Sequence, residues 1–74
     1  MDDLLDLALV RRALGKLEHD QQSVIIMRFI EELPTKAVAH ALGKSEGAVR
    51  VIQHRALKQL KKHIDDTRAP RATT

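Results

Sequence analysis

Residues 34–60 read PTKAVAHALGKSEGAVRVIQHRALKQL, and the architecture of the chain follows from them. Proline suits the first turn of a helix, so Pro34 marks the start of a short helix. Gly43 stands where a left-handed residue commonly ends a helix, and Ser45 is a good N-cap for the next one. The pattern therefore predicts one helix that ends before Gly43 and a longer one that runs to about Ile64, with a tight turn between them.

A short helix, a tight turn and a longer helix form a helix-turn-helix, whose second helix lies in the major groove of DNA. A plain helical hairpin has the same spacing, so spacing alone leaves both interpretations open. The two faces of the longer helix help to separate them. At 100° per residue, four apolar residues share one narrow stripe, which predicts the core side: Val49, Ile52, Ala56 and Leu60.

The opposite side of the longer helix carries cations and no acid. It consists of Gly47, Arg50, Val51, His54, Lys58 and Lys61, with Arg55 at its edge. A helix that serves only solubility usually mixes charge signs, whereas the single acid near this face, Glu46, stands in the first turn, where it suits the helix dipole. The small residues Gly47 and Ala48 allow the backbone to come close to a groove floor. This face favours nucleic-acid binding.

Two more helices are predicted before the proline. Asp2 and Asp3 suit a helix N-terminus, and the apolar residues that follow at spacings of three and four lie on one stripe: Leu7, Val10, Leu14 and Leu17. A second helix is predicted over about residues 20–30. Its apolar run is wide enough to require burial on more than one side, so we expect this helix to be central.

The whole chain is expected to form one small all-α domain. Residues 1–64 would fold as a bundle of about four helices that ends in the helix-turn-helix, and residues 65–74 would be a disordered tail. The chain has 74 residues and no cysteine. It is therefore shorter than most enzyme domains, and it has no disulfide and no thiolate metal site. We expect a binding module and not an enzyme.

Charge is distributed unevenly along the chain. Residues 1–34 hold four basic and seven acidic side chains, a net charge of −3, whereas residues 35–74 hold nine basic and three acidic ones, a net charge of +6. A polyanion would bind the basic half, although a solvated lysine-rich face gives the same excess of basic residues.

No apolar run approaches the ~20 residues of a membrane span, and the acidic start is no signal peptide. We expect a soluble cytoplasmic protein without a membrane partner.

Residues 17–60 as a whole resemble a known family. The pieces that carry the resemblance occur in order: VIIMRF at 24–29, Leu33 before a short helix that ends in ALG at 41–43, SEGAVR at 45–50 and HRALKQL at 54–60. No single piece is diagnostic. The ordered set resembles the C-terminal DNA-binding region, region four, of bacterial RNA polymerase sigma factors, and is most similar to the extracytoplasmic-function group.

This resemblance implies recognition of the minus-35 promoter element in transcription initiation, with the domain resting on the flap of the polymerase beta subunit. By position, six residues would face base edges: Ser45, Glu46, Gly47, Arg50, Val51 and His54. Arg28 and Arg55 match family positions that contact phosphates. We add three phosphate candidates of our own: Lys36, Lys44 and Lys58. Arginine reaches guanine O6 and N7 together, whereas basic residues around the turn contact only the backbone of DNA.

The chain departs from the common family pattern at two places. Pro34 replaces a frequent serine cap, which leaves the fold prediction intact because proline also starts a helix. Val51, Ile52 and Gln53 stand where many relatives carry serine, arginine and an apolar residue. The base sequence that is read therefore does not follow from the family. Val51 either contacts a thymine methyl group or simply lies in solvent.

Other kinds of site are weakly supported. Four histidines, His19, His40, His54 and His63, lie on three segments without a His-x-x-x-His pair on one helix face, so we expect no metal site and no cofactor. Glu31 and Glu32 are adjacent, and adjacent side chains on a helix point about 100° apart. They predict a solvated helix end, with no catalytic pair and no small-molecule substrate.

Three leucines of the first helix, Leu4, Leu5 and Leu9, exceed what one buried face needs. Spare apolar surface predicts a protein partner, such as the polymerase flap or an anti-sigma factor, or else self-association.

Two other functions remain open: a response-regulator output domain of the LuxR type, and a helical module that binds a regulator and not DNA. A complete sigma factor also needs a region for the minus-10 element, which we expect in a longer chain or on another chain.

Overall fold

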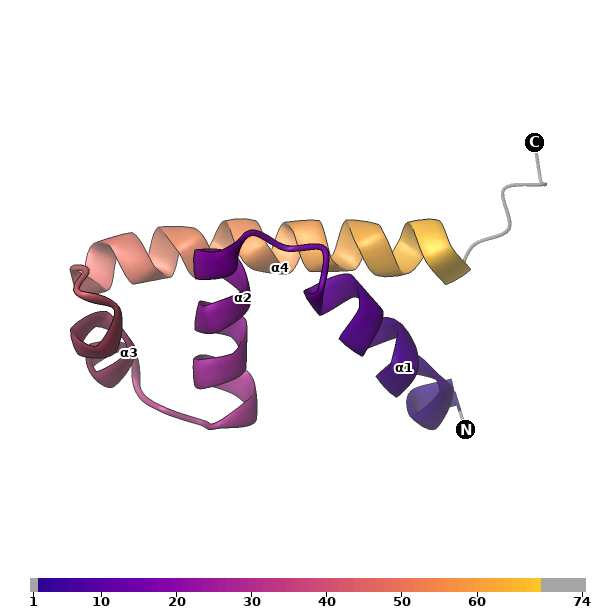
Figure 1. The fold of residues 1–74 in the computed structure, drawn as a ribbon, viewed down its shortest axis with the longest axis horizontal. Helices are drawn as coiled ribbons and strands as arrows, with labels where there is room; N and C mark the ends of the chain where they lie inside the picture. The colour runs from indigo at the N-terminus through magenta and orange to yellow at the C-terminus, as the bar shows by residue number, and fades with distance from the viewer. Residues whose placement is uncertain (1, 69–74) are drawn as a thin grey trace.

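The structure, a computed structural model, describes the backbone of residues 2–68 and the side chains of residues 8–66. Within that part of the chain it contains four α-helices, one π-helical turn and no strand: α1 (Asp2–Leu14), α2 (His19–Ile25), η1 (Ile26–Ile30), α3 (Thr35–Leu42) and α4 (Glu46–Arg68). The long α4 runs along one side of the molecule, and the other three helices all lie against the same side of it (Figure 1). The predicted all-α fold is confirmed.

Local hydrogen bonds fix the turn between α3 and α4. Gly43 adopts a left-handed conformation with φ 67°, and the N–H of Lys44 donates to the carbonyl oxygen of Ala39 at 2.9 Å. This is the bond of a Schellman motif, which satisfies a carbonyl at the end of the helix. On the other side of the turn, the Ala48 N–H donates to Ser45 Oγ at 3.0 Å, the expected N-cap bond. The predicted helix-turn-helix and both of its caps are confirmed.

The start of α3 follows the prediction as well. Pro34 is extended, with φ −71° and ψ 156°, and its carbonyl oxygen accepts the N–H groups of Ala37 and Val38 at 2.9 and 3.1 Å. Proline has no N–H to lose at this position, so it stands at the N-cap without disturbing the first turn, although it makes no side-chain cap bond. The first helical residue is Thr35.

We expect Gly43→Ala to destabilise the domain, by about 1 kcal/mol, because an L side chain at positive φ strains the backbone. The added methyl group would meet no other atom within 4 Å, so this strain is the whole cost. The matched control is Gly47→Ala in the first turn of α4, whose Cβ would meet only Ser45 Oγ at 4.0 Å. Alanine there should stabilise the helix, by about 0.5–1 kcal/mol. Thermal unfolding followed by circular dichroism should show shifts of opposite sign, and equal shifts would contradict the assignment.

Aliphatic side chains form two adjacent core clusters on the inner side of α4. One cluster comprises Leu14, Leu17, Ile25 and Ala56, with Val10 and Leu60 packed against it. The other comprises Val24, Val38, Ala39 and Val49, with Met27, Leu33, Leu42 and Ile52 packed against it. The predicted stripe of α4 takes part in both clusters, and its Val49 and Ala56 are fully buried. The side chain of Leu7, in the stripe predicted for the first helix, lies outside the described residues.

The segment predicted as one helix over residues 20–30 is confirmed as helical but changes its winding. After α2 the chain continues as the π-turn η1, in which the Glu31 N–H donates to the Ile26 carbonyl at 2.9 Å. The segment is central, because it lies between α1 and α3 under α4 (Figure 1). The prediction of wide burial is wrong for Phe29 and Ile30, which are 48% and 61% exposed. Val24 and Ile25 are buried in different core clusters, whereas the two exposed residues lie at the C-terminal end of the segment.

The C-terminal helix is longer than predicted. The sequence pattern places its end at about Ile64 and predicts disorder over residues 65–74, whereas α4 continues to Arg68. Within this extension, Lys61 Nζ donates to Asp65 Oδ2 at 2.9 Å, an i,i+4 pair that supports the extra turn. The rest of the predicted tail, residues 69–74, lies outside the described residues.

Candidate nucleic-acid interface

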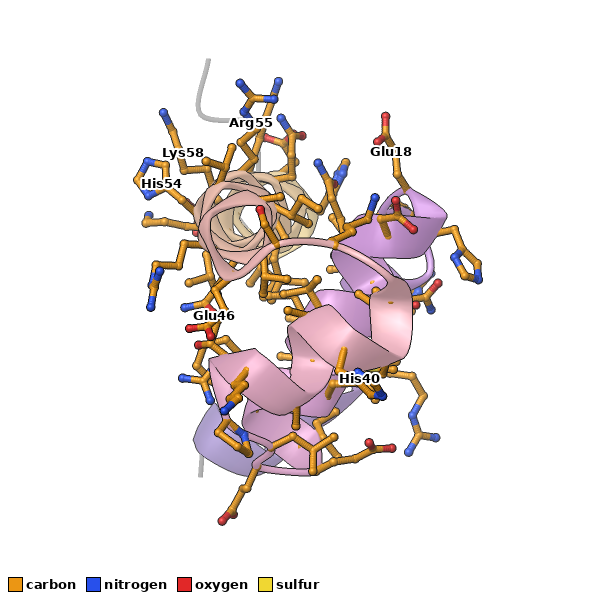
Figure 2. The ribbon with its side chains drawn as sticks, turned by 90° about the vertical axis from the view of Figure 1, so that its left-hand side faces the viewer. Glu18, His40, Glu46, His54, Arg55 and Lys58 are labelled. Atoms are coloured by element: carbon orange, nitrogen blue, oxygen red, sulfur yellow. The ribbon has the colours of Figure 1, made fainter. Side chains whose placement is uncertain are left out.

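The outer side of α4 is open along its length. All residues predicted for this face are exposed: Gly47, Arg50, Val51, His54, Arg55, Lys58 and Lys61. Figure 2, which looks along α4, shows His54, Arg55 and Lys58 pointing away from the other three helices. The burial of Val49 and Ala56 on the inner side fixes this orientation, because a helix that turns one stripe inward must present the opposite stripe to solvent. A groove of a duplex can therefore reach the face without rearrangement of the fold.

Glu46 places a negative charge on this face, contrary to the expectation of an acid-free surface. Its Oε1 accepts a hydrogen bond from Arg50 Nη2 at 3.4 Å, and the two side chains are 45% and 64% exposed. The spacing of four residues brings them together on the helix surface. The sequence contains this signal, since glutamate four residues before arginine is a favourable pair. The predicted base-reading surface is therefore of mixed charge at its N-terminal end.

Lys44, in the turn between α3 and α4, is paired with an acid from another element. Its Nζ lies 3.2 Å from Asp20 Oδ2 at the start of α2, and the lysine side chain is 31% exposed. The pair ties the turn to α2. Sequence reasoning missed this contact, because the two residues belong to segments whose proximity depends on the packing of the helices. The role of Lys44 at phosphates stays a prediction.

Arg28 holds together three parts of the domain. Its Nη1 donates to the carbonyl oxygen of Leu33 at 2.7 Å, and its Nε donates to Gln53 Oε1 on α4 at 3.3 Å. The guanidinium carbon also lies 5.6 Å from the centroid of the Phe29 ring. These contacts join the end of η1 and the following loop to α4, a structural role that the sequence did not reveal. The Nη2 group takes part in neither hydrogen bond, so the predicted phosphate contact stays open for this residue.

The remaining phosphate candidates are exposed cations. Arg55 and Lys58 share the outer side of α4, whereas Lys36 lies in the first turn of α3. No ion pair engages any of the three within the described part of the chain. Together with the turn, they place positive charge on both helices of the motif.

The described residues give little support for a metal site or a membrane-spanning helix. Of the histidines, His19, His40 and His54 are exposed and His63 is half-buried. Among the residues that the structure describes, no group of three or more histidine, aspartate and glutamate side chains is placed to hold a metal ion. None of the described helices combines the length and apolar character needed to cross a bilayer.

A comparison with known families identifies the domain. The family profile of sigma-70, region 4 matches residues 13–62, which run from the end of α1 into the second half of α4. The chain belongs to the sigma-70 region 4 family. This is a family of DNA-binding domains and not of enzymes. The match agrees with the resemblance drawn from the sequence and does not favour a LuxR-type output domain.

Curated relatives of this region 4 domain are sigma factors. The chain is 45% identical over 53 residues to the ECF RNA polymerase sigma factor SigX of Bacillus subtilis, an alignment that covers 72% of this chain and 27% of SigX. It is 38% identical over 60 residues to the RNA polymerase sigma-E factor of Streptomyces antibioticus, an alignment that covers 81% of this chain and 33% of that protein. It is 46% identical over 44 residues to the ECF RNA polymerase sigma factor SigD of Mycobacterium tuberculosis, an alignment that covers 60% of this chain and 21% of SigD. The chain thus spans about a third or less of each relative.

Proposed function

We propose that this region 4 domain binds the minus-35 element of promoters, as the C-terminal part of an extracytoplasmic-function sigma factor in transcription initiation. One observation carries the proposal above all: the cation-bearing side of α4 is open, and its opposite stripe is buried. The turn before α4 is held by caps at both ends, so the helix has a fixed direction in the motif. The sigma-factor relatives support the same function.

The two sets of predicted DNA contacts would have different tasks. In the first turns of α4, the residues proposed to face base edges are Ser45, Glu46, Gly47, Arg50, Val51 and His54. The residues proposed at phosphates are Arg28, Lys36, Lys44, Arg55 and Lys58. Phosphate contacts position the helix in the major groove but carry no sequence information, whereas base contacts distinguish one site from another. The exposed Val51 would contact a thymine methyl group.

We expect Arg50→Ala and Lys58→Ala to weaken DNA binding in different ways. Loss of a bidentate arginine–guanine contact should cost about 1–3 kcal/mol and relax the preference at one base pair. Loss of the lysine should lower the affinity for all DNA sequences alike. It should also reduce the slope of the logarithm of the binding constant against the logarithm of the salt concentration by about 0.9. Competition binding over base-substituted duplexes, repeated at several salt concentrations, measures both effects.

Equal losses for every sequence in both variants would contradict the division between base reading and phosphate contact. Selection of bound sequences from a random duplex library supplies the reference site for the comparison. A single asymmetric site is expected, because the proposed domain places one α4 in one groove. Two half-sites related by symmetry would instead indicate a dimer.

Protein partners are proposed on different grounds. Promoter recognition by a sigma factor requires RNA polymerase, so we propose that the domain contacts the polymerase core through the flap of the beta subunit, and that an anti-sigma factor restrains it. The exposed Phe29 and Ile30 offer apolar surface for such contacts. Among the three leucines predicted to be spare, Leu9 is half-buried, and the side chains of Leu4 and Leu5 lie outside the described residues. The proposed setting is the bacterial cytoplasm, at the nucleoid.

A further inference from the structure

Two acid–cation pairs lie on either side of Ser45, at the base-reading end of the motif. Asp20 pairs with Lys44 at 3.2 Å, and Glu46 pairs with Arg50 at 3.4 Å. The acids are comparably exposed, at 50% and 45% of their side-chain surface. They differ in location, because Asp20 belongs to α2 whereas Glu46 lies on α4 itself. Only Glu46 would enter a groove together with its cation.

The Glu46–Arg50 pair leaves hydrogen-bonding capacity on both partners. Only Glu46 Oε1 and Arg50 Nη2 take part in the bond between them. The second carboxylate oxygen and the remaining guanidinium N–H groups are therefore available to a ligand. An arginine in a major groove finds two acceptors on guanine, O6 and N7. A carboxylate in the same groove can accept a hydrogen bond only from an exocyclic amino group, on cytosine or adenine, and on adenine the neighbouring N7 acceptor repels it, which favours cytosine.

A base without an amino group would penalise the carboxylate. Glu46 loses bound water when α4 enters the groove. Desolvation of a charged group that gains no new hydrogen-bond partner costs free energy. Guanine and thymine present acceptors at the corresponding positions, so they also repel the carboxylate. The atoms that would contact bases, the second carboxylate oxygen and the remaining guanidinium N–H groups, are distinct from the two bonded atoms. The two side chains can therefore contact different bases while they remain bonded.

We propose that Glu46 and Arg50 act as one reading unit, in which Glu46 orients the guanidinium onto a guanine and accepts a hydrogen bond from the N4 amino group of a cytosine at an adjacent base pair. The inference rests on the proposed function, since it needs a duplex in contact with α4. It assigns to Glu46 a specificity role that acts mainly by rejecting other bases. Affinity for DNA in general is lowered by the same carboxylate, because it repels phosphates.

The test compares Glu46→Gln with Asp20→Asn in the full 74-residue chain. Both variants remove one negative charge from a similarly exposed acid–cation pair. The duplex is the best sequence from the random library, and the Arg50→Ala variant locates its guanine. Competition binding then measures the affinity for all four bases at each neighbouring position. Circular dichroism of each variant checks that the helices are intact.

For the unsubstituted chain we expect cytosine to be preferred over thymine at one neighbouring position by about tenfold. Glu46→Gln should reduce this preference to about twofold or less, since an amide both donates and accepts, while binding to unrelated duplexes becomes tighter. Asp20→Asn should also tighten binding to unrelated duplexes, but it should keep the full preference of about tenfold.

Other outcomes overturn the inference in distinguishable ways. An unchanged preference in Glu46→Gln would refute the reading unit and leave promoter binding intact. An equal loss of preference in both variants would show a general electrostatic effect and would equally refute it. If the unsubstituted chain distinguishes no duplex from any other, the proposed function itself fails, and the reading unit fails with it.

Discussion

Reversal of charge at both Arg50 and Arg55, to glutamate, should lower promoter affinity by about 100-fold or more, because each contact to guanine or phosphate is worth about 1–3 kcal/mol and glutamate adds repulsion. Both arginines are exposed on the outer side of α4, so the substitutions leave the core unchanged. The measurement is fluorescence anisotropy of a labelled promoter duplex, at low and at moderate salt.

The control for this variant reverses Arg11 and Arg12 instead. Both are exposed in the last turn of α1, and their reversal changes the net charge of the chain by the same amount. Affinity should fall only slightly, through the long-range field, and less so at higher salt. If the α4 variant keeps its promoter affinity while binding to a protein partner falls, the domain is a protein-interaction module and the DNA proposal is wrong.

Substitution of Val49 by aspartate should unfold the domain. Val49 is fully buried between α3 and α4, in the cluster that also contains Val38 and Val24. A carboxylate there has no partner, and burying it costs about 4–5 kcal/mol or more. A domain this small rarely has more than about 3–5 kcal/mol of total stability, so the substitution removes all or nearly all of it. Far-ultraviolet circular dichroism at about 25 °C should show most of the helical signal lost.

Val51→Asp is the matched control for this loss of stability. Val51 lies two residues further along α4, on the opposite side, and is 49% exposed. The same substitution there should leave the helical signal and the thermal midpoint nearly unchanged, although it should weaken DNA binding by repulsion. Unfolding of both variants, or of neither, would show that the inner and outer sides of α4 have been assigned wrongly.

Most of the fold is predictable because its strongest signals are local. Pro34, Gly43 and Ser45 mark the ends of α3 and α4 through backbone geometry and short-range hydrogen bonds that need no tertiary contact. The apolar stripe of α4 likewise fixes which side is buried. Local signals are weaker at the C-terminal end of α4, where charged residues continue the helix beyond Ile64 and the next helix-breaking residue in the sequence, Pro70, comes only after Arg68.

Periodicity and capping are properties of neighbouring residues, so the four helices, the turn, the inner side of α4 and the open, cation-rich side opposite to it all follow from the order of the amino acids. The packing of helices settled the rest. It set Arg28 against Gln53, placed Lys44 beside Asp20, and left Phe29 in solvent although it belongs to an apolar run. The two contacts join residues far apart in the chain, and which residues meet depends on how α2 lies against α4. The pattern along one helix carries no information about that arrangement.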